Sequence, residues 1–518
     1  DWVQTKLDAY DRNGGKGFRI LTRTFTSPSV TSQIREILNR YPQAKWRLYD
    51  PVGDDSIRQG ANLAFGERVD TIHHFDRAEV VVALDSDFLT TGPASVHDAH
   101  AFMTRRREGV ESGAMNRLYS IETSSTPTGV VADHRLPLKP SQFETFVWAL
   151  AQRVGVNIEP VDESGLDQEF LDRLVNDLKD HRGSSLFIAG PWTSARTHAL
   201  VHAMNQVLGN VGKTVVYTEP VVPFEEDPSP SLAELVQEMN DGEVETLLVF
   251  DGNPNYDTPA DLKFAEAYEK VPERIHYGLY HNETALRSHW HIPAAHPLEA
   301  WGDARAYDGT ASLSQPTIAP LYGGRTPQEV LAAFLKRPAH TPLQLVQDYW
   351  RTRLGEESDF TIQWNRALRD GVIPDTRSPS KEVSLRSLDL EPPKPNKDDS
   401  LEVVFRPDPS VWDGSLCNNG WLQELPKPIT RLTWDNAAIL GPDTASKQGL
   451  EMGDEVTLAL HERTINAPVF ILPGHPEGSV TLHLGYGRTR SGANGDGVGF
   501  NAYQLRTSTA PWTDAGLT

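Results

Sequence analysis

Cysteine is almost absent from this sequence, in which Cys417 is the only one among 518 residues. A single thiol cannot form a disulfide within the chain, and it cannot supply the four thiolates of an iron–sulfur cluster or of a Cys₄ zinc site. Long apolar runs are also missing, because none approaches the roughly 20 residues that a helix needs to cross a bilayer. We therefore expect no direct insertion of this chain into a membrane.

Positive charge is scarce as well, with 49 Lys and Arg against 71 Asp and Glu and a formal net charge of −22. A surface of this sign repels polyanions, which argues against nucleic acid and anionic membrane surfaces as partners. The balance does not forbid a local basic pocket, but the densest basic run, Arg105–Arg107, is better interpreted as a solvated helix face. Because the chain begins at Asp1 rather than at Met, we expect it to be part of a longer polypeptide.

Short apolar runs alternate with amphipathic stretches through the first 300 residues. The runs that predict strands include Phe18–Thr22, Trp46–Tyr49 and Val80–Leu84, the last of which is continuously apolar, as is typical of a strand buried on both faces. This alternation indicates βαβ units and a parallel sheet. The same alternation of strand and helix patterns starts again after Gly155, so we expect two Rossmann-like, doubly wound α/β lobes.

The composition changes toward the C-terminus. Residues 373–400 are rich in Pro, Lys, Ser and Asp and predict a linker, whereas short β runs and Gly- and Pro-bearing turns after Leu401 indicate a small β-barrel. A chain of this length is also too long for one core. We expect a first lobe over residues 1–155, a second lobe over 156–300, a return to the first lobe with helices over 301–372, the linker over 373–400 and the barrel over 401–518.

One stretch brings two strand ends together. The predicted strand Thr246–Phe250 breaks into Asp251-Gly252-Asn253-Pro254, and the next strand, Ile275–Tyr280, opens into His281-Asn282-Glu283-Thr284. Ligands of doubly wound sheets bind just beyond the carboxyl ends of the strands. We therefore expect these two loops to form the mouth of a ligand site.

Several motifs in the chain occur in the order of a known family. The Gly252-Asn253-Pro254 loop and the Glu283-Thr284 pair are followed, in the C-terminal part, by Trp434-Asp435-Asn436, Gly449–Asp454, Gly485-Tyr486-Gly487 and Gly497–Asn501. Together they resemble the molybdopterin (bis-guanine-dinucleotide) oxidoreductase family. The resemblance implies a fold like that of dimethyl sulfoxide reductase and formate dehydrogenase, with two Rossmann-like lobes and a C-terminal β-barrel like those that bind molybdopterin dinucleotides.

The resemblance also implies which residues would bind a pterin dinucleotide. Glycines let backbone N–H groups approach phosphates, and strand-end Asp or Asn side chains can bind the guanine and ribose edges. For each residue singly, a role as turn former or helix cap is an equally good interpretation, so we treat them as vestigial candidates. The candidate positions are Asp85, Gly190, Gly252, Asn253, Thr284, Trp434, Asn436, Gly485 and Asn501.

The chain departs from the family's pattern where the metal would be bound. Active members place a Cys, selenocysteine, Ser or Asp in the loop after the second strand, where this chain has Tyr49 followed by Asp50. A neutral phenol with a pKa of ~10 is a poor ligand, whereas Asp50 could bind the metal if the register shifts by one. Asp85 and Asp87 also place negative charge where a pyrophosphate would lie.

These departures favour a chain with no catalytic residue, no metal and no cofactor of its own. The alternative is an active molybdenum or tungsten enzyme that holds a bis-molybdopterin guanine dinucleotide with Asp50 as the metal ligand. A hydrolase or binding protein that merely uses the cleft is a third interpretation. If the cleft has been filled, we expect side chains such as Trp192, Trp290 or Arg196 to fill it.

The same losses resemble one branch of the family, the molybdopterin-like part of the large iron–sulfur subunit of alternative complex III, often labelled an iron–sulfur-cluster-containing hydrogenase. In that branch a cofactor-free fold precedes a ferredoxin-like domain that carries the clusters. The resemblance implies a scaffold fragment of a quinol:electron-acceptor oxidoreductase. Its implied partners are the other subunits of a membrane respiratory complex and an iron–sulfur domain later in the full-length chain, on the periplasmic face of the bacterial inner membrane.

Two other patterns are weaker. The densest histidine cluster, His281, His289, His291 and His296, is better interpreted as surface or pocket polar residues than as a zinc site. The run Gly209–Thr214 imitates a phosphate-binding loop, but only two residues separate its glycines and a helix is predicted to precede it. Neither pattern predicts a site.

Overall fold

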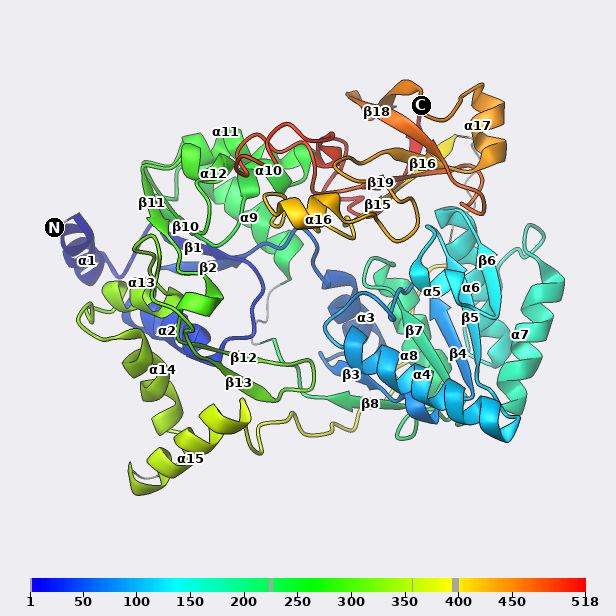
Figure 1. Ribbon diagram of the computed structural model, residues 1–518, viewed down its shortest axis with the longest axis horizontal. Coiled ribbons are helices and arrows are strands. Elements are labelled where there is room, and N and C mark those ends of the chain that lie inside the picture. The colour runs from blue at the N-terminus through cyan, green and yellow to red at the C-terminus, as the bar shows by residue number, and fades with distance from the viewer. Residues whose placement is uncertain (1, 223–226, 356, 394–399) are drawn as a thin grey trace.

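Two parallel α/β sheets lie side by side, with a curled β-sheet above them (Figure 1). The computed structural model describes residues 2–222, 227–355, 357–393 and 400–518. Among these residues, no helix combines the length and the apolar character needed to cross a membrane. The α/β class, the two parallel sheets and the C-terminal β structure predicted from the sequence are confirmed.

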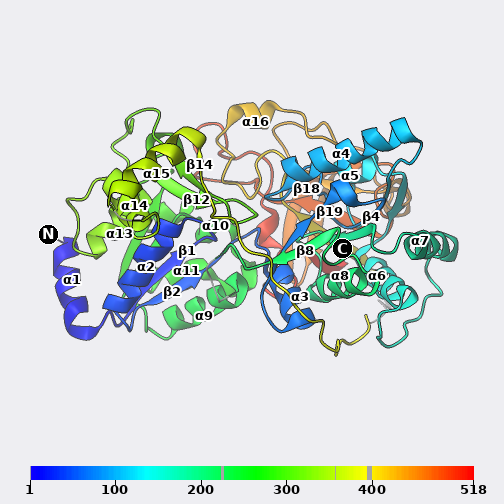
Figure 2. The same cartoon turned by 90° about the horizontal axis from the view of Figure 1, so that it is seen from below.

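The first lobe is built on a five-stranded parallel sheet of order β11-β10-β9-β1-β2. Alternate residues of its strands point to opposite faces, so that Ile20 and Leu248 pack beneath α1, α2 and α13, whereas Leu21 and Leu247 pack beneath α9 and α11. Figure 2 shows α2 and α9 on opposite sides of β1 and β2. The elements are β1 (Phe18–Thr22), β2 (Lys45–Leu48), β9 (Thr246–Phe250), β10 (Glu273–Gly278), β11 (Trp290–Pro293), α1 (Trp2–Asn13), α2 (Pro28–Arg40), α9 (Pro228–Asn240), α11 (Phe264–Glu269) and α13 (Pro327–Phe334).

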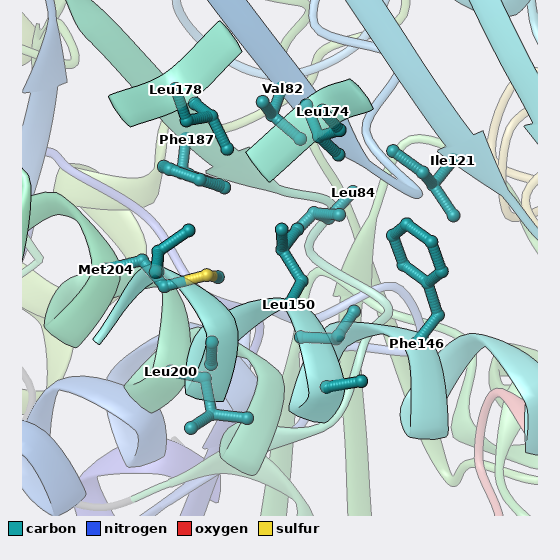
Figure 3. Packing of buried hydrophobic residues seen from close by; sticks show 14 of the residues in the cluster. Val82, Leu84, Ile121, Phe146, Leu150, Leu174, Leu178, Phe187, Leu200 and Met204 are labelled. Carbon is teal, nitrogen blue, oxygen red and sulfur yellow. The ribbon is translucent and has the colours of Figure 1, made fainter. Parts of the chain in front are cut away.

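The second lobe has a four-stranded parallel sheet of order β6-β5-β4-β7. One face of it packs against α6, α7 and α8, where Val82, Leu84 and Phe187 meet Leu150 and Leu174 (Figure 3). The other face lies beneath α3 and α4. The elements are β4 (Val80–Leu84), β5 (Arg117–Glu122), β6 (His134–Pro137), β7 (Ser185–Ala189), α3 (Asp55–Phe65), α4 (Ser95–Ser112), α6 (Pro140–Val154), α7 (Gln168–Asp180) and α8 (Ala195–Val207).

The lobes are not consecutive in the sequence, which corrects the expected boundaries at residues 155 and 300. Strands β1 and β2 pair with β9 and its neighbours, and the second lobe is inserted between them. An antiparallel pair, β3 (Asp70–His73) and β8 (Val215–Thr218), marks the entry to and exit from the insertion. The alternation of strands and helices predicts which segments are strands, but it does not contain the information about which strands pair.

The C-terminal sheet closes on itself, as the predicted barrel requires. Its order is β17-β18-β16-β19-β15-β20, and the two outer strands meet where Ala459 and Thr518 exchange backbone N–H···O hydrogen bonds of 2.8 and 3.0 Å. The strands are β15 (Leu401–Arg406), β16 (Ala438–Leu440), β17 (Glu455–Leu460), β18 (Arg463–Ile471), β19 (Ser479–His483) and β20 (Thr513–Leu517).

The remaining elements connect these three parts. A three-stranded antiparallel sheet and two helices extend the first lobe. The predicted linker is only partly free, because Leu385, Leu388 and Leu390 pack against the core of the second lobe; its residues 394–399 lie outside the described residues. The elements are β12 (Gly302–Arg305), β13 (Ala311–Ser314), β14 (Val372–Ile373), α14 (Pro342–Arg351), α15 (Glu357–Asp370), α5 (Pro127–Val130), α10 (Pro254–Asp257), α12 (Glu283–Leu286), α16 (Gly420–Glu424) and α17 (Pro442–Gln448).

Gly190 illustrates how closely β4 and β7 approach each other at their carboxyl ends. Its N–H donates to Leu84 O at 2.9 Å, and a Cβ at this position would lie 1.8 Å from the carbonyl oxygen of Asp85. We expect Gly190→Ala to lower the free energy of unfolding by about 3 kcal/mol, because backbone atoms would have to move. Gly165→Ala is the matched control, since a Cβ there meets open space. Equal urea midpoints for the two variants would contradict this assignment.

Candidate functional site

The predicted mouth exists, but side chains fill it. Strands β1, β2 and β9 end beside one another, and the cavity at their carboxyl ends measures about 10 Å³. That is room for about one water molecule, whereas a pocket for an organic ligand usually measures roughly 300–1,000 Å³. The lining residues are Leu21, Thr22, Arg23, Tyr49, Pro51, Val249, Asp251, Gly252, Asn253, Pro254 and Asp257.

Arg23 lies at the centre of this region, one residue beyond β1. Its Nη2 donates to Asp50 Oδ1 at 3.2 Å and also to Asp413 Oδ2, from the loop that follows β15. The Asp413 side chain is only 1% exposed. Burial alone would raise the pKa of Asp413, but the Arg23 charge and hydrogen bonds from Ser415 hold it below its usual value. One guanidinium thus joins the ends of β1 and β2 to the C-terminal part of the chain.

The two candidate metal-ligand positions are both engaged within the protein. The Tyr49 hydroxyl donates to the carbonyl oxygen of Asp257 at 2.5 Å, and burial raises the pKa of Tyr49 well above its usual value. A buried neutral phenol that is already a hydrogen-bond donor is a poor metal ligand. Asp50 Oδ1 accepts from Arg23 and from the Val52 N–H, so this oxygen is already engaged by a guanidinium.

The Gly252-Asn253-Pro254 loop is bound by its own neighbours. Asn253 Oδ1 accepts from the Thr284 N–H at 3.1 Å and from Thr284 Oγ1 at 2.9 Å, while Asn253 Nδ2 donates to Glu283 Oε2 at 2.7 Å. The carbonyl oxygen of Gly252 lies 3.2 Å from the Asn282 amide, which donates to it, and 3.1 Å from His276 Nε2. The sequence therefore brings together the predicted residues of the two loops, but they bind each other.

Glu283 connects this loop to the barrel. It accepts two guanidinium N–H groups of Arg488, at 3.0 and 2.9 Å, and the backbone N–H groups of Thr489 and Arg490. Arg488 directly follows the Gly485-Tyr486-Gly487 motif. Burial opposes the charged form of Glu283, but Arg488 and these hydrogen bonds lower its pKa to about 2. The carboxylate therefore stays ionised and holds the motif against the first lobe.

Both carboxylates of the loop at the end of β4 are engaged within the protein. Asp85 forms a buried ion pair with Arg406 and accepts from the N–H and hydroxyl of Thr123, both at 2.9 Å. Asp87 accepts from the N–H and hydroxyl of Thr128 and from Thr90. Arg406 of the barrel is thus the ion-pair partner of Asp85.

Two larger cavities remain between the second lobe and the barrel, with volumes of about 290 and 420 Å³. Asp85 and Trp192 contribute to the walls of both. The cations that line the smaller cavity, Arg406 and Lys427, form ion pairs with Asp85 and Asp408. The larger cavity is lined by the acidic residues Asp85, Glu144, Glu402 and Asp514.

The candidate cofactor-binding residues in the barrel make contacts within the protein. Asn436 is 1% exposed; its amide donates to the carbonyls of His483 and Phe500 and its oxygen accepts from the Phe500 N–H. Asn501 caps a short 3₁₀ turn by accepting from the Tyr503 N–H at 2.9 Å. Gly485 has a φ of 97°, and a Cβ there would lie 2.7 Å from the carbonyl oxygen of Trp412. Trp434 is partly exposed, and its backbone N–H donates to the carbonyl oxygen of Gln423.

None of the three side chains expected to fill the cleft lines the cavity at the ends of β1, β2 and β9; Trp192 instead lies in the walls of the two cavities between the second lobe and the barrel. Its ring lies near those of Trp412 and Trp512, with centroids 6.3 and 5.7 Å away. Trp290 is half exposed on the edge strand β11, and Arg196 pairs with Glu144. Arg23 is the main side chain that occupies the cleft. The sequence analysis did not name it, although a residue directly after a strand of such a sheet lies at the edge where ligands bind.

The histidines of the cluster contact one another and nearby backbone groups. Among the described residues, no group of three or more His, Cys, Asp or Glu side chains is arranged to hold a metal ion. His291 lies near His281 and has its Nδ1 3.0 Å from Nδ1 of the buried His276. His289 accepts from the Arg274 N–H, and His296 caps a short turn. These roles agree with the interpretation of the cluster as polar surface and pocket residues.

The residues present do not fit a molybdenum bis-molybdopterin guanine dinucleotide. The first-lobe cavity has room for about one water molecule, and Arg23 donates to Asp50, one of the two candidate metal-ligand positions. In the second lobe, a pyrophosphate would lie among carboxylates, with the nearby cations already paired. Anionic groups near a pyrophosphate are unfavourable unless a cation lies between them.

Comparisons with known proteins support the resemblance to the molybdopterin oxidoreductase family. No family model matches the chain. The menaquinone reductase molybdopterin-binding-like subunit of Nitratidesulfovibrio vulgaris (strain Hildenborough) is 22% identical over 504 residues, which cover 86% of this chain and 71% of that protein. Acetylene hydratase from Pelobacter acetylenicus has the same fold, with a TM-score of 0.67, 13% identity and coverage of 98% of this chain and 85% of that one.

Removal of the Arg23 charge tests its role as the central ion-pair partner. We expect Arg23→Met to lower the free energy of unfolding by roughly 3 kcal/mol, because it leaves the buried Asp413 without its counter-charge. The double variant Arg23→Met/Asp413→Asn should recover part of the loss. Arg173→Met removes a pair that is exposed on both sides and should change stability by less than about 0.5 kcal/mol. A loss in the double variant that equals the sum of two separate losses would contradict the coupling.

The low pKa of Glu283 predicts a pH dependence. Its pKa falls from 4.5 in a model peptide to about 2 in the folded protein, so its contribution to stability is present above about 4.5 and is lost as pH falls toward about 2. The difference in unfolding free energy between the wild type and Glu283→Gln should therefore be largest near neutral pH and shrink in acid. Urea titrations at several pH values measure it, and a difference that stays constant across this range would contradict the assignment.

Proposed function

We propose that this chain is a cofactor-free scaffold with a molybdopterin-oxidoreductase-like fold, and that it serves as a subunit of a respiratory quinol:acceptor oxidoreductase. The observation that carries the proposal is the position of Arg23, whose guanidinium pairs with Asp50 and Asp413 where a metal-bound cofactor would lie. The similarity to a subunit of a menaquinone reductase supports a place in a respiratory complex.

In this proposal, ion pairs hold the parts of the chain together. The barrel is joined to the first lobe by Arg23–Asp413 and Glu283–Arg488 and to the second lobe by Asp85–Arg406. All three pairs lie at the carboxyl ends of parallel strands, where ligands of such sheets bind. The chain thus holds its three parts together with its own charges, and a bound cofactor is not needed for that purpose.

The partners and location follow from the same proposal. The chain would contact the other subunits of a membrane respiratory complex of the alternative complex III type. An iron–sulfur domain later in the full-length polypeptide would carry the electrons, and the complex would lie on the periplasmic face of the bacterial inner membrane. In this arrangement the chain transfers no electrons itself.

The alternative function is an active molybdenum or tungsten oxidoreductase with Asp50 as ligand. It requires Asp50 to exchange the Arg23 guanidinium for a metal and the cavity above Gly252 to open far beyond its present 10 Å³. In that case Asp50→Ala would lose both metal and activity, while Tyr49→Phe would be harmless.

Chemical analysis of the protein purified from its native source tests the proposal. We expect neither stoichiometric molybdenum or tungsten by mass spectrometry of the metals nor release of a guanine nucleotide on acid hydrolysis, because the cavity at the ends of β1, β2 and β9 measures about 10 Å³ and Arg23 already pairs with Asp50. A family member that binds the cofactor, treated in parallel, controls for cofactor loss during purification. One pterin and one metal per chain would overturn the proposal.

A further inference from the structure

The smaller of the two cavities between the second lobe and the barrel has walls rich in aromatic and proline rings. It measures about 290 Å³, close to the lower end of the usual range for pockets that hold small organic molecules. Trp192 and Trp412 stand in its walls, with ring centroids 6.3 Å apart. Four prolines and the aliphatic residues Ile429, Ile439 and Leu472 make up the rest of the apolar lining. A molecule in this cavity would therefore contact mainly flat apolar surfaces.

The charged groups in these walls are engaged within the protein. Arg406 pairs with Asp85. Lys427 pairs with Asp408 at 3.3 Å. The remaining carboxylate of the walls, Asp87, accepts three hydrogen bonds from neighbouring threonines. Among the described residues of the walls, an anionic ligand would find no free cation and a cationic ligand no free carboxylate. Because an unpaired charge is costly to remove from water, the cavity favours a neutral molecule.

One polar group in the walls has no partner, the imidazole of His483 on β19. The carbonyl oxygen of His483 accepts from Asn436, but no group in the described part of the chain forms a hydrogen bond with its ring. The other histidine of the walls, His475, has its ring nitrogens 3.1 Å from Pro476 O and 2.9 Å from Thr481 Oγ1. Burial lowers the pKa of His483 to about 4. At neutral pH its ring therefore offers one donor and one acceptor.

These features together indicate the chemistry of a ligand. Aromatic rings pack favourably on tryptophan, either offset-stacked or edge-to-face. A neutral imidazole donates from one nitrogen and accepts at the other, and a hydroxyl group can pair with either. A pure hydrocarbon would fit the apolar walls but would leave the partly buried ring of His483 without a hydrogen bond. A neutral aromatic compound with a hydroxyl group matches the apolar walls, the balanced charges and the unpartnered imidazole.

We propose that this cavity is a binding site for a neutral hydroxylated aromatic molecule of one or two rings, which lies against Trp192 and Trp412 with its hydroxyl group bonded to His483. Because the walls come from both the second lobe and the barrel, a bound molecule would connect these two parts of the chain. The cavity shares no wall residue with the one at the ends of β1, β2 and β9. The cofactor-free proposal rests on Arg23 in that other cavity, so a negative result here would leave it unaffected.

Equilibrium dialysis with 1-naphthol, and with naphthalene as the analogue that lacks the hydroxyl group, tests the proposal. We expect one saturable site per chain for 1-naphthol. His483→Leu should weaken 1-naphthol roughly fivefold, because a hydrogen bond is lost, and should leave naphthalene nearly unchanged. His483→Gln keeps a donor and an acceptor and should retain most of the affinity for 1-naphthol. His340→Leu is the matched control, since this histidine is exposed, and it should bind both compounds like the wild type.

The aromatic wall is tested in the same assay. Trp192→Ala should weaken both 1-naphthol and naphthalene, whereas Trp421→Ala, which removes a side chain that is 87% exposed, should weaken neither. Charged analogues test the preference for a neutral ligand on the unaltered protein, which keeps the proposal testable if a variant fails to fold by circular dichroism. We expect 1-naphthoate and 1-naphthylmethylammonium to bind at least about tenfold more weakly than 1-naphthol at neutral pH.

Three outcomes would overturn the proposal. The first is the absence of saturable 1-naphthol binding up to its solubility limit. The second is an equal loss of 1-naphthol and naphthalene binding in His483→Leu, which would show that this residue only packs. The third is tighter binding of 1-naphthoate or of 1-naphthylmethylammonium than of 1-naphthol, which would indicate a site for a charged ligand.

Discussion

Ion pairs at the strand ends help to hold the barrel against the two lobes, and a further pair, Lys139–Glu402, also joins the barrel to the second lobe. Arg23–Asp413, Glu283–Arg488 and Asp85–Arg406 each join a strand end of a lobe to the C-terminal part of the chain. Burial of charges is costly unless each is paired and its remaining hydrogen-bonding capacity is used. Here every acidic partner accepts further hydrogen bonds from backbone or hydroxyl groups. The result is a closed interface at the place where related folds would bind a ligand.

Several residues of the sequence motifs make contacts within the chain. Asn253, Thr284 and Asn436 use their polar atoms to connect loops of this chain, and Gly485 allows a backbone approach that a side chain would block. These positions are therefore required by the fold, whether or not a cofactor is bound. A motif of this kind is therefore stronger evidence for the fold than for a bound cofactor.

Much of the architecture could be predicted from the sequence, because strands, helices and strand-end loops are encoded locally. Val80–Leu84 and Phe18–Thr22 were correct as strands to the residue. The order of the strands could not be predicted, since pairing of β1 with β9 depends on contacts across more than 200 residues. The side chains that fill the site were likewise not predicted, because Arg23 and Asp413 are 390 residues apart and neither is unusual within its own segment.

The most direct test of the central claim is an experimental density map of the protein purified from its native source, at a resolution that distinguishes side chains from metal. The account predicts continuous density for the Arg23 guanidinium between Asp50 and Asp413, with no strong peak beside Tyr49. Density for a metal–dithiolene group above Gly252, with Arg23 displaced from both carboxylates, would contradict it.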